Sequence, residues 1–148
     1  MEKEYIQELG AMFGCQIPLG HLADGARWPI SKLCGYLAVV HTGKCISGSE
    51  QGYYSHSRIS GVLGISYFSV LVGNDGRMDL DAVEQLLQQG DVGTVVVTMG
   101  NTGIGAVDPL SQILLLRRKY NFRIHADAAY GAYGAYFRLA ANLGSDNQ

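Results

Sequence analysis

The 148-residue sequence lacks the marks of a nucleic-acid-binding, membrane-spanning or secreted protein. Its 11 lysines and arginines are outnumbered by 13 aspartates and glutamates, so no basic excess favours nucleic acid or anionic lipid as a partner. No apolar run approaches the ~20 residues that a membrane-spanning helix needs. The first four residues, MEKE, are too polar for a secretory signal. We therefore expect a cytoplasmic protein with neither a nucleic-acid nor a membrane partner.

Cysteine and charged residues are scarce, whereas glycine is abundant. The three cysteines (Cys15, Cys34 and Cys45) form no CxxC pair, so the sequence predicts neither a disulfide framework nor a zinc site. Charged residues make up 16% and hydrophobic residues 47%, a balance that excludes an extended disordered chain. The 20 glycines are about twice the usual ~7% share. Such a share is typical either of loops that close over a ligand or of tight backbone packing.

The order of the predicted elements indicates one α/β domain with a mostly parallel sheet flanked by helices. Apolar residues at helical spacing predict helices over residues 2–13, 29–40, 56–63, 80–89 and 109–120. Alternating or continuous β-branched runs predict strands over residues 44–47, 66–72, 94–99 and 122–126. Asp79 is expected to cap one of these helices and Gly90 to end it. Strands that alternate with helices through short loops are typical of βαβ units.

Polar residues follow two of the predicted strands. The sequence is GNTGIGAVDP over residues 100–109 and HADAAYG over residues 125–131. In open parallel sheets, ligands bind beyond the carboxyl ends of the strands, where such segments lie. Asp127 ends an apolar strand, where an unpaired carboxylate is costly to desolvate. We therefore expect a cationic or hydrogen-bonding group to face Asp127.

Taken singly, these residues leave several interpretations open. Gly100, Gly103 and Gly105 run G-x-x-G-x-G, which is not the order of a dinucleotide-binding fingerprint. His125 and Asp127 share one face of a strand, but no third ligand at compatible spacing favours a metal site. An aspartate at the end of a strand is also a common turn or helix cap.

Taken together and in order, the segments resemble the large domain of the group II pyridoxal-phosphate-dependent decarboxylases. The motifs lie at residues 19–22 (LGHL), 55–64 (SHSRISGVLG), 75–79 (DGRMD), 100–109 and 125–131. The resemblance implies the aspartate aminotransferase-like fold of type I and pyridoxal 5′-phosphate as cofactor. It also implies a homodimeric carboxy-lyase that decarboxylates an L-amino acid. Members of the family act on aromatic amino acids, tyrosine, histidine or glutamate.

The resemblance assigns roles around the cofactor ring. Asp127 matches the aspartate that pairs with the ring nitrogen and keeps it protonated, and Ala129 would lie under the ring. Thr102 matches a threonine that hydrogen-bonds near the ring substituents. Tyr53 stands at the stacking position, where the family usually has histidine but an aromatic plane is preserved. His56, three residues further along, is expected to face elsewhere.

The resemblance also assigns a phosphate-binding turn. Gly25 and Ala26 align with the Ser-Gly-Gly-Thr type turn of the family, just before the helix predicted from Pro29. Backbone N–H groups at the start of that helix would point at the phosphate, and Arg27 would add positive charge. Asp24 places an anion where the family has a hydroxyl group.

One expected part of the family has no counterpart here. The Schiff-base lysine follows the HxDAA segment in the family, whereas the lysines of this chain all precede it (Lys3, Lys32, Lys44 and Lys119). We therefore assign no catalytic residue. We expect an N-terminal helix and loop over 1–28 and a partial large domain over 29–148 that lacks the lysine segment and the C-terminal small domain. Such a fragment would be inactive alone; the alternatives are another fold-type-I enzyme (an aminotransferase or lyase) or a non-catalytic remnant.

Overall fold

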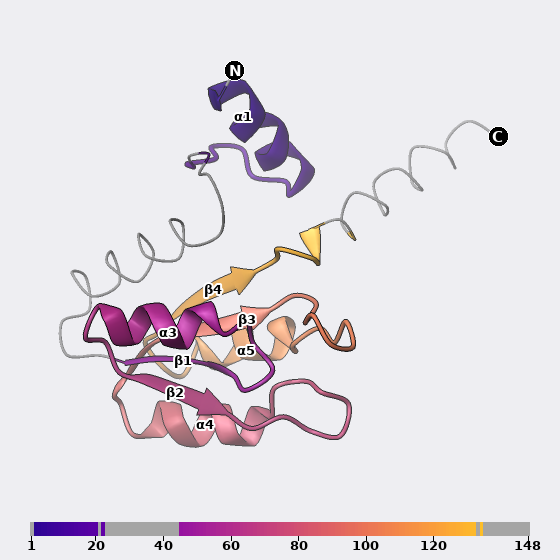
Figure 1. The fold of residues 1–148 in the computed structure, drawn as a ribbon. Coiled ribbons are helices and arrows are strands. Elements are labelled where there is room, and N and C mark those ends of the chain that lie inside the picture. Colours follow the sequence, from indigo (N-terminus) through magenta and orange to yellow (C-terminus); the bar gives the residue numbers. More distant parts are fainter. Residues whose placement is uncertain (1, 21, 23–44, 133, 135–148) are drawn as a thin grey trace.

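The computed structural model describes residues 2–20, 22, 45–132 and 134 (Figure 1). The helices are α1 (Glu2–Met12), α3 (Ser55–Val62), α4 (Leu80–Gln88) and α5 (Leu110–Leu116). The strands are β1 (Cys45–Ser49), β2 (Tyr67–Val70), β3 (Val92–Thr98) and β4 (Arg123–Asp127). The helix predicted over 29–40 lies outside the described residues. None of the helices that the structure describes is long and apolar enough to cross a lipid bilayer.

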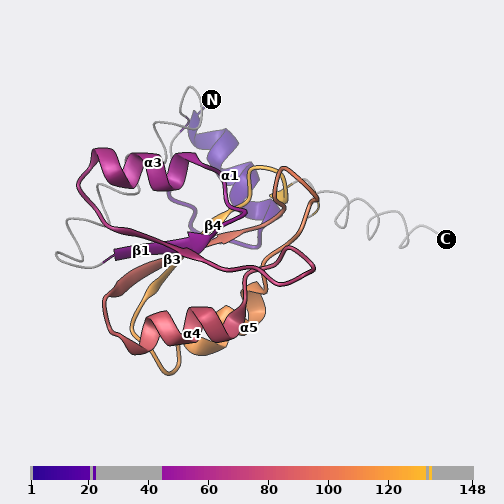
Figure 2. The same cartoon turned by 60° about the horizontal axis from the view of Figure 1, so that its bottom comes forward.

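The four strands form one parallel sheet in the order β2-β1-β3-β4. Helix α3 covers one face of the sheet, and α4 and α5 cover the other (Figure 2). This arrangement confirms the predicted α/β architecture. Because all strands run in one direction, their carboxyl ends lie along the same edge, and the segments that follow them meet there.

The core lies on both faces of β3, as its continuous β-branched run predicts. All seven residues of β3 are buried. Val95 and Val97 pack towards α4 and α5, where the larger of two apolar clusters also contains Val83, Leu87 and Ile113. On the opposite face, Val96 and Ile46 form a smaller cluster, against which partly buried apolar residues of 59–67 pack. The sheet is therefore anchored from both sides.

Helix α5 and strand β2 both end earlier than the sequence predicts, whereas β1 runs on to Ser49 and β3 begins at Val92. Helix α5 ends at Leu116 and not at residue 120, and in the next turn the N–H groups of Arg118 and Lys119 donate to carbonyls three residues earlier. The Tyr120 hydroxyl and the Lys119 ammonium bind Glu84 of α4, which holds this segment against its neighbour. Strand β2 ends at Val70, because Val72 pairs only with Met78 in an isolated antiparallel bridge.

Asp79 caps α4 as predicted, and this cap gives a test of local stability. Its Oδ1 accepts hydrogen bonds from the N–H groups of Asp81 (2.8 Å) and Ala82 (3.3 Å). We expect Asp79→Ala to lower the free energy of unfolding by about 1 kcal/mol, because two N–H groups of the first turn lose their acceptor. Urea denaturation of the 148-residue chain measures this loss. Asp91→Ala, at an exposed position before β3, is the control, and equal losses in both variants would contradict the cap's contribution.

Candidate functional site

A cavity of about 470 Å³ lies at the carboxyl edge of the sheet. Three segments line it: the start of α3 with the residues before it, the end of β3 with the following loop, and the end of β4 with residues 128–130. These segments are far apart in the sequence, and the parallel sheet brings them together. The cavity therefore lies where open α/β sheets bind their ligands.

Four of the residues singled out in the sequence line this cavity together. They are Tyr53, Thr102, Asp127 and Ala129. Tyr53 precedes α3, Thr102 lies in the loop after β3, and Asp127 is the last residue of β4. The other two candidates, Gly25 and Ala26, lie outside the described residues.

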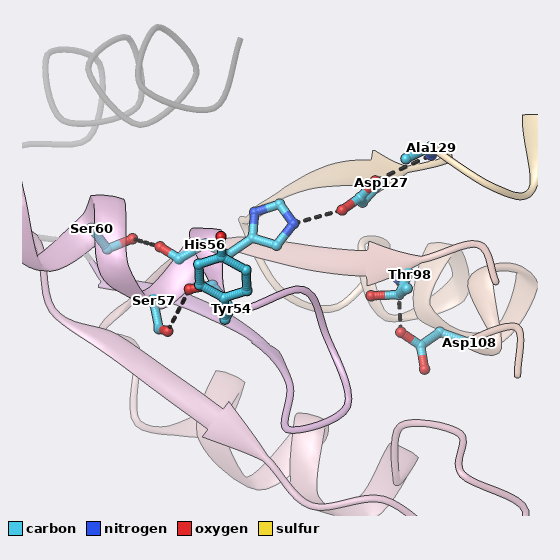
Figure 3. Close-up of polar contacts among 8 residues, drawn as sticks. All are labelled: Tyr54, His56, Ser57, Ser60, Thr98, Asp108, Asp127 and Ala129. Carbon is cyan, nitrogen blue, oxygen red and sulfur yellow. Dashed lines mark hydrogen bonds and ion pairs between the residues drawn. The ribbon is translucent and has the colours of Figure 1, made fainter. Parts of the chain in front are cut away.

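Asp127 has hydrogen-bond partners on both carboxylate oxygens (Figure 3). His56 Nε2 lies 2.7 Å from Oδ2, and the Ala129 N–H donates to Oδ1 at 3.2 Å. These contacts confirm the prediction that a hydrogen-bonding group faces Asp127. The hydrogen bond from His56 lowers the pKa of Asp127 below its ordinary value, although burial acts in the opposite direction. Asp127 is therefore an ionised carboxylate at neutral pH.

The expectation that His56 faces elsewhere is wrong. Its side chain points at Asp127 and lines the cavity, and the residue is only 2% exposed (Figure 3). The physical reason is the turn that starts α3: the His56 N–H donates to the Tyr53 carbonyl three residues earlier at 3.1 Å, just ahead of the first helical residue, Ser55, and both residues line the cavity. Tyr53 and His56 therefore face the same space. The three-residue spacing between Tyr53 and His56 could have indicated from the sequence that His56 belongs to the site.

His125 is a second histidine in the cavity wall. Its ring lies edge-on to that of His56, with the centroids 6.1 Å apart. Burial lowers the pKa of His125, the neighbouring His56 lowers it further, and Asp127 opposes the shift. The lowered pKa favours the neutral form of His125, so the charge at this wall of the cavity is the negative charge of Asp127.

The loop after β3 is held in place by Asp108. This residue is 4% exposed, and its two carboxylate oxygens accept hydrogen bonds from the N–H groups of Met78 and Thr98, each at 2.8 Å. Burial raises the pKa of Asp108, and both N–H groups act against that rise. Gly100 starts the loop with φ of 103°, a conformation that residues with a side chain rarely adopt. The loop is thus fixed at its start by the conformation of Gly100 and at its end by the hydrogen bonds of Asp108.

Two buried polar atoms in the cavity wall have no hydrogen-bond partner among the residues that the structure describes. They are Thr98 Oγ1 and Asn101 Nδ2. The Asn101 Oδ1 atom accepts hydrogen bonds from the N–H groups of Ile104 and Ala106, which leaves the amide nitrogen as a donor. Buried polar atoms normally have partners, so this wall suits a polar ligand. Sequence reasoning missed both residues, because only the fold reveals which polar atoms lack a partner.

The fold and the cavity together define the class of protein. A parallel sheet covered by helices on both faces carries a ligand-sized cavity at its carboxyl edge. An ionised aspartate, an aromatic side chain and a small residue meet there. Such a combination is typical of an α/β domain that binds a cofactor with a flat, nitrogen-containing ring.

The chain belongs to the pyridoxal-dependent decarboxylase family. Residues 42–137, more than half of the chain, match the pyridoxal-dependent decarboxylase conserved domain. The chain is 34% identical over 122 residues to the L-2,4-diaminobutyrate decarboxylase of Rhizobium meliloti, covering 73% of this chain and 25% of that protein. It is 26% identical over 159 residues to the probable L-tyrosine/L-aspartate decarboxylase of Methanosarcina barkeri, covering 90% of this chain and 38% of that protein.

Solved structures agree on the fold. The crystal structure of mouse CSAD is similar with a TM-score of 0.75 at 22% identity, covering 90% of this chain and 32% of that chain. The glutamate decarboxylase domain of the Vibrio parahaemolyticus diaminobutyrate-pyruvate transaminase and L-2,4-diaminobutyrate decarboxylase gives a TM-score of 0.69 at 20% identity, covering 88% of this chain and 34% of that chain. The fold is therefore part of the fold-type-I large domain. The chain spans less than two fifths of the length of these curated relatives.

Proposed function

We propose that this chain supplies part of the cofactor site of a pyridoxal-phosphate-dependent carboxy-lyase that removes carbon dioxide from an L-amino acid. The observation that carries the proposal is the ionised Asp127, which shares one cavity with Tyr53 and Ala129. The family match over residues 42–137 supports the same conclusion.

The residues of the cavity fit the cofactor. Asp127 would hold a proton on the ring nitrogen, Tyr53 would stack on one face of the ring, and Ala129 would leave room at the other. Thr102 would hydrogen-bond a ring substituent, and the unpartnered Thr98 Oγ1 supports a polar ligand in this cavity. When bound, the cofactor supplies an electron sink for the pair released as carbon dioxide leaves.

Further features of the proposal concern parts beyond the cavity. We propose that Gly25 and Ala26 contact the cofactor phosphate, and that residues 1–28 are an N-terminal segment ahead of a cofactor-binding large domain over 29–148. We also propose a homodimer in the cytoplasm, which is the state that resemblance to the group II decarboxylases implies. Chemical crosslinking and size-exclusion chromatography of the full-length protein test the dimer.

Carbon dioxide release is the direct test of the proposed reaction. The full-length protein is incubated with pyridoxal phosphate and, separately, with L-aspartate, L-tyrosine, L-2,4-diaminobutyrate and L-glutamate. The first three are the substrates that the relatives' names give. We expect one of these amino acids to yield carbon dioxide and the corresponding amine in equal amounts. Transfer of the amino group to a 2-oxo acid without carbon dioxide would instead indicate an aminotransferase.

Enlarging Ala129 tests whether the ring lies against it. We expect Ala129→Leu to weaken pyridoxal phosphate binding by about tenfold or more, because the added carbons occupy the space proposed for the ring. Equilibrium dialysis of the full-length protein measures the dissociation constant. Ala11→Leu, the same change at an exposed position of α1, is the matched control. Equal affinity in both variants would show that the ring does not lie at Ala129.

A further inference from the structure

The segment that follows β4 lies directly against the backbone at the end of β3. The Met99 N–H donates to the Asp127 carbonyl at 2.8 Å, one residue beyond the last paired residues of the two strands. Four residues after Asp127, the backbone of Gly131 packs onto the Met99 carbonyl group. Residues 128–130, which line the cavity, lie between these two contacts. This part of the cavity wall is therefore attached to Met99 at both of its ends.

A side chain at position 131 has no room. A Cβ atom there would overlap the Met99 carbonyl oxygen, and it would lie 2.8 Å from the carbonyl carbon and 2.9 Å from the Met99 Cβ. Carbon atoms in contact normally lie about 3.5–4.0 Å apart. The carbonyl group belongs to the backbone beside a buried strand, so it cannot turn aside as a flexible side chain could. Gly131 has no positive φ, so the position requires the missing side chain and not an unusual backbone conformation.

Glycine also occupies the facing position in the loop after β3. A Cβ atom at Gly100 would lie 3.6 Å from the Gly131 nitrogen and 3.7 Å from the Tyr130 Cβ. Two glycines therefore meet where two walls of the cavity join. The abundance of glycine in the sequence is typical either of loops that close over a ligand or of tight backbone packing. At Gly131 both interpretations apply, because the tight packing of its backbone places a wall of the cavity.

The close approach at Gly131 bears on two residues of the candidate site. The Ala129 N–H donates to Asp127 Oδ1 at 3.2 Å (Figure 3), so an outward shift of the segment would break this bond and release one side of the carboxylate. The same shift would move Ala129 away from Thr102 in the facing loop, since both residues line the cavity. A misplacement of about 1 Å can lower the rate of an enzyme about a hundredfold.

We propose that Gly131 is a positioning residue: its lack of a side chain lets the segment after β4 close against Met99, and this close approach places Ala129 and the Asp127 carboxylate at the cavity. The inference rests on the proposed function, because it takes the cavity as the seat of the cofactor ring. Gly131 acts through its neighbours and does not itself contact the ring. A glycine that served only stability would change the fraction of folded molecules and not the cofactor affinity of the folded ones.

The first experiment measures the contact itself in the 148-residue chain, without cofactor. Amide hydrogen exchange, followed by ¹H–¹⁵N NMR, compares the wild type with Gly131→Ala and Gly103→Ala. We expect Gly131→Ala to raise the exchange rate of the Met99 N–H about tenfold or more, because the added methyl group forces the segment outwards and weakens the bond to Asp127. The N–H groups in the middle of β3 should exchange as in the wild type. Gly103→Ala adds the same methyl group at an exposed position with no described atom within 4 Å, and it should leave the Met99 N–H unchanged.

An unchanged exchange rate of the Met99 N–H in a folded Gly131→Ala variant would overturn the inference. An equal rise at every N–H group of the sheet would also overturn it, since a general loss of stability gives that result. Should Gly131→Ala fail to fold, nuclear Overhauser effects in the wild type decide the matter. We expect cross-peaks from the Gly131 Hα protons to the Met99 Hβ protons and the Gly100 Hα protons, and their absence would contradict the close approach.

The second experiment measures pyridoxal phosphate binding to the full-length protein by equilibrium dialysis, at a temperature at which all variants stay folded. We expect Gly131→Ala to raise the dissociation constant about tenfold or more. Val83→Ala is the control for stability, because it removes two carbon atoms from the buried core beside α4, and it should keep the wild-type dissociation constant. If the wild type binds the cofactor and Gly131→Ala binds it equally well, the inference fails while the proposed function stands. If the wild type binds none, the proposed function fails, and the NMR measurements alone decide whether Gly131 positions the segment.

Discussion

Replacing Asp127 with asparagine is expected to lower the rate of decarboxylation by the full-length protein about a thousandfold. A unit charge pair at ~4 Å is worth about 4 kcal/mol at an effective dielectric constant near 20, and each ~1.4 kcal/mol changes a rate tenfold. Asparagine keeps the shape of the side chain but lacks the charge that would hold a proton on the ring nitrogen. The rate of carbon dioxide release at saturating amino acid and cofactor measures the loss.

The control for this substitution is Asp81→Asn on the exposed side of α4, which removes the same charge away from the cavity. We expect it to leave the rate unchanged. Because the hydrogen bond from His56 lowers the pKa of Asp127, the wild-type carboxylate stays ionised throughout the neutral range. The deficit of Asp127→Asn should therefore be the same at pH 6 and pH 8. A rate near that of the wild type would show that Asp127 serves only as a cap at the end of its strand.

Removing the carboxylate of Asp108 is expected to cost about 2–6 kcal/mol in the free energy of unfolding. Asp108→Ala leaves the N–H groups of Met78 and Thr98 without acceptors, and each buried unpaired group costs about 1–3 kcal/mol. Asp108→Asn keeps one oxygen acceptor, so we expect about half of that loss. Chemical denaturation of the 148-residue chain measures both variants.

The exposed Asp91→Ala variant calibrates this experiment, because it removes an aspartate without removing a buried acceptor. We expect it to change the free energy of unfolding by less than about 0.5 kcal/mol. If Asp108→Ala were no more destabilising than Asp91→Ala, the loop after β3 would not depend on Asp108. A loss in Asp108→Asn equal to that in Asp108→Ala would show that both oxygens are needed.

The sequence predicted those elements well whose formation depends on neighbouring residues in the chain. The run of β-branched residues at 94–99 marked β3, and Asp79 marked the start of α4 because the cap is made within one turn. The end of α5 could not be predicted in this way. The segment after Leu116 is held by contacts that the local pattern does not contain, such as the bond from the Tyr120 hydroxyl group to Glu84 of α4, 36 positions away.

The candidate site shows the same division. The resemblance to the group II decarboxylases selected Tyr53, Thr102, Asp127 and Ala129, and the structure brings all four to one cavity. It did not select His56, whose importance depends on a carboxylate 71 residues away. Asn101 was missed for a related reason. Its Oδ1 atom accepts a hydrogen bond within its own loop, and only the folded structure shows that its Nδ2 atom is buried without a partner among the described residues.

The cavity has walls from three stretches of chain that come together only in the folded sheet. A molecule seated there would touch all three stretches at once, whereas the unfolded chain offers no such arrangement. A bound ligand would therefore raise the free energy of unfolding. The increase is about 2.7 kcal/mol when the free ligand is at one hundred times its dissociation constant. The melting temperature of this protein would then rise with the fraction of molecules that have a ligand in the cavity.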